Sequence, residues 1–112
     1  MEVSVARSSA VPVVSVTGEV DVYSAPTLDE RLSELQRGGD ARLVVDLREV
    51  GFLDSTGLGV LVEARASAAE QGGAMPIVCN QERVRKLFTI TGLDGVFSIH
   101  ETVDSALAAA RA

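Results

Sequence analysis

The chain has 112 residues, a hydrophobic share of 46% and a net charge of −6. This length suits one domain over residues 1–112, and the apolar share suffices for a buried core, which excludes a disordered chain. The negative charge argues against nucleic-acid and membrane partners, and no apolar run approaches the roughly 18 residues that span a bilayer. The single cysteine, Cys79, cannot form an internal disulfide, so we expect a cytoplasmic protein.

Hydrophobic periodicity predicts the elements of the first half of the chain. Apolar residues with a period of two predict a hairpin of two strands at residues 3–5 and 11–16. A helix follows, which Ser24 caps and Gly38 ends, and its apolar stripe consists of leucines with helical spacing. Consecutive apolar residues at 43–47 predict a strand that is buried on both faces.

A second helix is predicted from a corner at residues 54–57 to about Gln71. The later predicted elements are a strand at residues 76–79, a helix at 81–91, a strand at 96–99 and a helix that Thr102 caps. The order is therefore β-β-α-β-α-β-α-β-α, in which helical crossovers favour parallel strand pairing. We expect an α/β domain with a small mixed β-sheet flanked by about four helices.

The corner Asp54-Ser55-Thr56-Gly57 places a carboxylate and two hydroxyls where a helix begins, which favours either chemistry or contact with a partner. A hydrolase elbow needs glycine two residues before the serine, but Leu53 stands there, and His100 is the only histidine. A phosphate-binding loop needs a lysine that this segment lacks, and Asp54 would repel the phosphate. Nucleotide binding is therefore a weak alternative.

The residues alone leave two interpretations of the corner open. Asp54 or Ser55 could simply cap the helix, while Gly57 and Gly59 allow close packing of helix and sheet. Alternatively, the two glycines, each costing about 1 kcal/mol relative to alanine in a helix, expose bare backbone to a partner. A phosphate on Ser55 would add about −1.5 to −2 charges, with Arg48 the nearest cation in sequence, so it would block docking without refolding the domain.

Two segments resemble a known family: Gly18-Glu19-Val20-Asp21 and Phe52-Leu53-Asp54-Ser55-Thr56-Gly57-Leu58-Gly59-Val60-Leu61. They are similar to the STAS domain of bacterial anti-sigma factor antagonists, and residues 79–88 and 90–93 are similar to its actinobacterial branch. The resemblance implies that the unphosphorylated protein binds an anti-sigma factor serine kinase and releases a sigma factor. It also implies that phosphorylation of Ser55, with the adjacent Thr56 as second choice, abolishes binding and that a PP2C-type phosphatase restores it.

The same resemblance implies which residues contact the partner. We expect contacts at Asp21, Asp54, Thr56, Gly57, Leu58 and Gly59. We expect no catalytic residue, no metal ligand and no cofactor, so the chain is predicted to be a binding module of stress-response transcription regulation and not an enzyme. A weak homodimer is compatible with this function, and the alternative is a scaffold STAS domain of a larger signalling assembly. Tyr23, beside the Asp21 loop, fits either a surface contact or half-buried packing.

Overall fold

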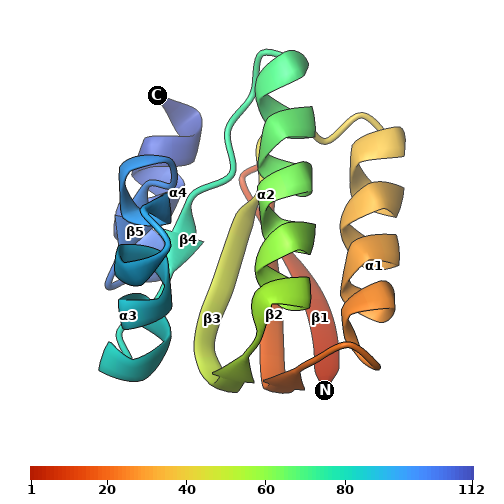
Figure 1. Cartoon of the computed structure of the whole chain (residues 1–112). Coiled ribbons are helices and arrows are strands. Elements are labelled where there is room, and N and C mark those ends of the chain that lie inside the picture. Colours follow the sequence, from red (N-terminus) through yellow and green to blue (C-terminus); the bar gives the residue numbers. More distant parts are fainter.

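The computed structural model describes all 112 residues and has the predicted order of strands and helices, with one additional 3-10 turn (Figure 1). The elements are β1 (Glu2–Ser8), β2 (Val11–Val20), α1 (Ala25–Arg37), β3 (Val44–Leu53), α2 (Ser55–Glu70), β4 (Ile77–Val78), α3 (Glu82–Ile90), η1 (Leu93–Gly95), β5 (Ile99–His100) and α4 (Val103–Arg111). The prediction of a mixed sheet with four helices is therefore confirmed. None of these helices has the length and apolar character that crossing a bilayer requires.

The strands form one sheet in the order β1-β2-β3-β4-β5. β1 pairs with β2 in antiparallel fashion, and every later pair is parallel. Because β2 and β3 are parallel, with Val20 opposite Leu53 at their ends, the turn that follows β2 lies beside the corner that follows β3. Both loops lie at the lower end of the sheet in Figure 1.

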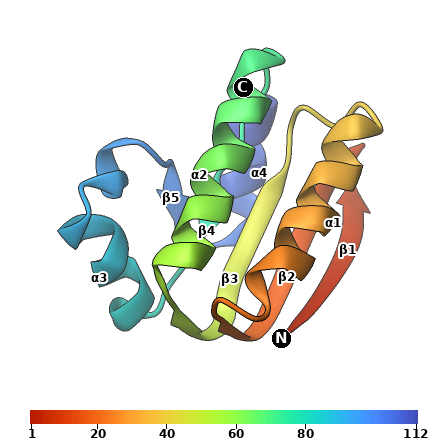
Figure 2. The ribbon, with the colours of Figure 1, turned by 45° about the vertical axis from the view of Figure 1, so that its right-hand side comes forward.

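Helices cover both faces of the sheet, but unequally. A core cluster of 21 buried residues joins the sheet to α1, α2 and α3, and it includes Leu28, Leu61 and Phe88. α4 lies on the opposite face (Figure 2), where three of its residues and three of the sheet form a cluster of six buried residues. Successive strands advance across the sheet in one direction, so right-handed crossovers place α1, α2 and α3 on one side. The larger cluster therefore fixes α2 on the sheet through its buried face, while its first residue, Ser55, stays exposed.

All five strands differ from their predicted ranges, β1 and β4 by one to three residues at an end. β2 and β3 continue to Val20 and Leu53, beyond the predicted ends at residues 16 and 47. Shifts in the β2–β3 register, one of them next to Gly18 with its φ of 92°, break the alternation on which the prediction of β2 depended. The last strand is present but shifted from the predicted range 96–99 to Ile99–His100, because η1 comes first and pairing with β4 starts at Ile99.

Candidate functional site

The corner between β3 and α2 is built around the Asp54 side chain. The Asp54 N–H donates to the Val20 carbonyl at 3.2 Å, which joins the corner to the end of β2. Asp54 has extended backbone, and its Oδ1 accepts from the Gly57 N–H at 3.0 Å. Asp54 is therefore the N-cap of α2, which decides between the two residues that could have capped this helix.

Ser55 and Thr56 are the first two residues of α2, and both are exposed. Their hydroxyls make no hydrogen bond within the chain, because Asp54 already satisfies the first-turn N–H group that a hydroxyl could have taken. The N-terminus of a helix carries a partial positive charge and free N–H groups, so an anion attached here is tolerated by the helix itself. The corner thus presents two free hydroxyls at a position that accepts negative charge.

Gly57 and Gly59, which the sequence left open between packing and exposure, have opposite environments. A Cβ on Gly57 would lie 2.5 Å from Leu53 Cδ1 and 2.8 Å from Val20 Cγ1, so this glycine allows close packing of helix and sheet. A Cβ on Gly59 would meet nothing within 4 Å, so its backbone is open to solvent. Direct partner contact, predicted for Gly57 and Leu58, does not fit this packing, because both residues are buried.

The turn after β2 is held together by Asp21 and Ser24. Asp21 Oδ1 accepts from the backbone N–H groups of Tyr23 and Ser24, each at 3.0 Å, and lies 3.1 Å from Ser24 Oγ. Ser24 Oγ also accepts from the Asp21 N–H and donates to the Glu19 carbonyl. Ser24 is the N-cap residue of α1, as predicted, but its side chain makes no capping hydrogen bond, because this hydroxyl is engaged within the turn.

These bonds have an electrostatic consequence for Asp21. The Ser24 backbone N–H, supported by the Ser24 hydroxyl and the Tyr23 N–H, lowers the pKa of the Asp21 carboxyl. All of these donors act on Oδ1, so Oδ2 makes no hydrogen bond within the chain. Asp21 therefore combines the structural role of a turn carboxylate with an oxygen that has no partner within the chain.

Exposed apolar side chains lie on these two connections. Tyr23 is 90% exposed and Val22 57% exposed in the turn, and Phe52 is 46% exposed at the end of β3. The prediction that Tyr23 packs half-buried is therefore wrong, and the alternative of an exposed side chain is confirmed. Val22 and Phe52 were not among the predicted contact residues, although Phe52 opens one of the two segments singled out in the sequence and Val22 directly follows the other. Large exposed apolar groups beside free hydroxyls are typical of a protein-docking surface.

The cations near the corner are not the ones that the sequence suggested. Arg48 makes a bidentate contact with Asp46, with Nη2 2.9 Å from Oδ2, so its charge is neutralised within β3. Instead, Arg83 of α3 lines a groove of about 130 Å³ together with Phe52 and Leu53. A positive charge beside the end of β3 thus comes from α3, about thirty residues later in the chain.

The side chains that could support catalysis, His100 and Cys79, are hydrogen-bonded elsewhere or buried. Both ring nitrogens of His100 lie 2.6 Å from serine hydroxyls, Nε2 from Ser98 Oγ and Nδ1 from Ser105 Oγ. The hydrolase interpretation therefore loses the histidine that would activate Ser55. Cys79 is fully buried, and this burial raises the pKa of its thiol, which disfavours the reactive thiolate.

Comparison with known proteins finds one family over almost the whole chain: the STAS domain matches residues 2–106. The anti-sigma-B factor antagonist of Bacillus subtilis (strain 168) is 44% identical over 87 residues, which are 77% of this chain and 78% of that protein. The anti-sigma-B factor antagonist of Staphylococcus aureus (strain NCTC 8325) is 35% identical over 88 residues, covering 79% and 82%. The crystal structure of an anti-sigma factor antagonist from Mycobacterium paratuberculosis superposes with a TM-score of 0.91 at 32% identity, covering 99% of this chain and 94% of that one.

Proposed function

This chain belongs to the STAS domain family, and we propose that it is an anti-sigma factor antagonist whose binding is switched by phosphorylation of Ser55. The unphosphorylated form binds an anti-sigma factor serine kinase in the cytoplasm and so releases a sigma factor. The protein acts by occupying its partner and not by catalysis. The observation that carries the proposal is the exposed, unbonded Ser55 hydroxyl at the start of α2, beside the exposed Tyr23.

The docking surface of this proposal consists of the turn after β2 and the corner after β3. Asp21 Oδ2 and the Thr56 hydroxyl offer polar contacts, Asp54 fixes the corner, and the open backbone at Gly59 allows close approach. Tyr23 supplies the aromatic anchor that dominates many interfaces. Gly57 and Leu58 support this surface from beneath because both are buried.

Phosphorylation would change this surface far more than it would change the fold. The free N–H groups of the first helical turn accommodate the phosphate, so α2 stays in place. A partner, in contrast, would meet a desolvated dianion next to two carboxylates, Asp21 and Asp54. A 100-fold loss of affinity requires only about 2.7 kcal/mol, and one repelled dianion at an interface suffices for that. Removal of the phosphate by a PP2C-type phosphatase would restore binding.

The test compares three variants against the cognate kinase, identified by its retention on immobilised Ser55→Ala protein. We expect Ser55→Ala to bind as tightly as the unphosphorylated wild type in calorimetry without ATP. Ser55→Asp should bind about 100-fold more weakly, because it places a carboxylate at the phosphate position. Ser4→Asp, on the exposed face of β1, is the matched control and should bind normally. Equal affinity of Ser55→Asp and Ser4→Asp would rule out the switch.

A further inference from the structure

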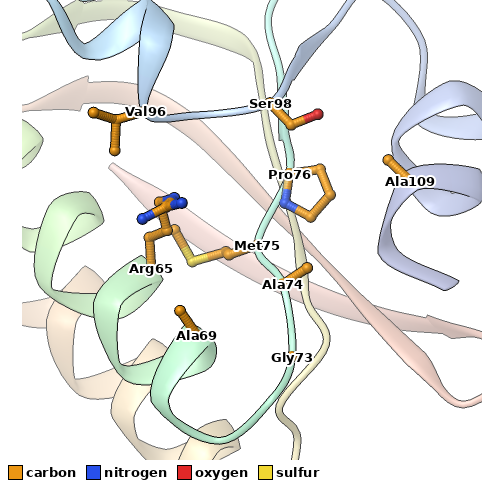
Figure 3. Close-up of a pocket in the computed structure, with 9 residues that line it drawn as sticks. All are labelled: Arg65, Ala69, Gly73, Ala74, Met75, Pro76, Val96, Ser98 and Ala109. Carbon is orange, nitrogen blue, oxygen red and sulfur yellow. The ribbon is translucent and has the colours of Figure 1, made fainter. Parts of the chain in front are cut away.

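A second hollow lies at the end of the sheet opposite the corner, where the chain enters β4 (Figure 3). It has a volume of about 170 Å³. Its lining residues come from α2, the segment before β4, the loop before β5, and α4: Arg65, Ala69, Gly73, Ala74, Met75, Pro76, Val96, Ser98 and Ala109. None of these residues belongs to the docking surface described above.

Arg65 is the one charged residue of this cavity, and no carboxylate lines it. Figure 3 shows the Arg65 side chain reaching from α2 over Met75 towards Val96. Its guanidinium makes no hydrogen bond and no ion pair within the chain, whereas Arg7 and Arg48 are each paired with a nearby aspartate. An unpaired guanidinium is complementary to an anion, and its planar fork suits a carboxylate in particular.

Most of the remaining wall is apolar. Met75 and Pro76 are buried in the floor, and Val96 and Ala109 lie on either side. Ser98 is the other polar side chain, and its hydroxyl is already held by His100 Nε2 at 2.6 Å. The lining therefore matches a molecule with one negative group and an apolar body, as is usual for small-molecule sites in which a few polar groups fix orientation.

The volume limits the size of that molecule. An apolar protein cavity of about 150 Å³ is large enough to hold benzene. A cavity of about 170 Å³ thus has room for one ring or a short alkyl chain, with a carboxylate beside Arg65. A nucleotide is far too large, which separates this site from the nucleotide binding considered for the corner.

We propose that this cavity binds a small aromatic or short-chain carboxylic acid, with Arg65 pairing its carboxylate and the wall around Met75 and Pro76 enclosing its apolar body. The site is independent of the proposed switch, because it lies at the other end of α2 from Ser55 and uses none of the same side chains.

The test uses benzoate as the probe and benzamide as its neutral counterpart of the same shape. Backbone amide shifts in ¹H–¹⁵N NMR should report saturable benzoate binding in the millimolar range, centred on Ala69, Ala74 and Ser98. Benzamide should bind about tenfold more weakly, because it cannot form the charged pair with Arg65. Ala69→Leu, which fills the cavity from α2 and leaves Arg65 intact, should abolish the binding of both probes.

Two arginine variants distinguish specific benzoate binding in this cavity from a general attraction of benzoate to positive charge. Arg65→Gln should weaken benzoate binding about tenfold, to the level of benzamide, while Arg83→Gln on α3 should leave it unchanged. The proposal is overturned if benzoate gives no saturable shifts in the millimolar range or if benzamide binds equally well. It is also overturned if Arg65→Gln retains wild-type affinity, or if Ala69→Leu still binds.

Discussion

The turn after β2 and the corner after β3 contain the same two residue types, an aspartate and a serine, yet they use them differently. In the turn, Ser24 follows Asp21 by three residues, so its hydroxyl folds back onto the Asp21 backbone and carboxylate. In the corner, Ser55 directly follows Asp54, whose carboxylate reaches forward to Gly57, and the serine hydroxyl stays free. Spacing therefore decides which hydroxyl stabilises the fold and which one is available to a partner.

The two loops use their polar groups for different purposes. The turn uses its polar groups to hold a fixed backbone from which Tyr23 projects at 90% exposure. The corner uses one carboxylate to cap α2 and leaves the rest of its polar groups to solvent. In the proposed function, one loop supplies the rigid anchor and the other the group that is phosphorylated. The two loops are joined by the Asp54–Val20 backbone hydrogen bond.

The largest expected effect comes from removing the exposed aromatic side chain of the turn after β2. Tyr23→Ala should weaken binding of the anti-sigma factor kinase by about 2 kcal/mol, or roughly thirtyfold, because a protruding aromatic residue is a typical interface hot spot. The unfolding free energy should hardly change, since Tyr23 contacts little of its own domain. Calorimetry with Val96→Ala as the exposed apolar control would check this. Unchanged affinity in Tyr23→Ala would show that the turn is not part of the docking surface.

The two glycines of the corner give the next largest effect, with opposite signs. Gly57→Ala should destabilise the domain by about 1 kcal/mol, because overpacking against Val20 and Leu53 exceeds the gain in helix propensity. Gly59→Ala should stabilise it by up to about 1 kcal/mol, because the added methyl group meets open space. Urea denaturation measures both. If the two substitutions shift stability in the same direction, the packing assigned to Gly57 is wrong.

The smallest expected effect comes from removing the negative charge of Asp21 in the turn after β2. Because folding lowers the Asp21 pKa, its ionised form stabilises the fold at pH values above the unfolded pKa of about 4. This stabilisation is lost as the pH falls through the folded pKa. Asp21→Asn should therefore melt below the wild type at pH 7, and the difference should shrink in acid. A difference in Tm that stays constant from pH 7 to acid would contradict the charge-based role of Asp21.

The sequence predicted the α/β order and the leucine stripe of α1 because both depend on local periodicity, and Leu28 and Leu32 are indeed fully buried. It could not predict that Ser24 would bond to Asp21 and not to the helix, because both choices satisfy a backbone donor equally well. It also could not place Arg83 beside Phe52, since that groove depends on how α3 packs against β3. Local rules thus defined the corner, and tertiary packing defined its surroundings.

The most direct test of the switch maps phosphate on the protein after incubation with the cognate kinase and ATP. Intact mass spectrometry and peptide mapping of the wild type, Ser55→Ala and Thr56→Val would locate the acceptor. We expect a single phosphate on Ser55, which is lost in Ser55→Ala and retained in Thr56→Val. Phosphorylation of Ser55→Ala to the same extent as the wild type, or a phosphate mapped to Thr56, would contradict Ser55 as the switch.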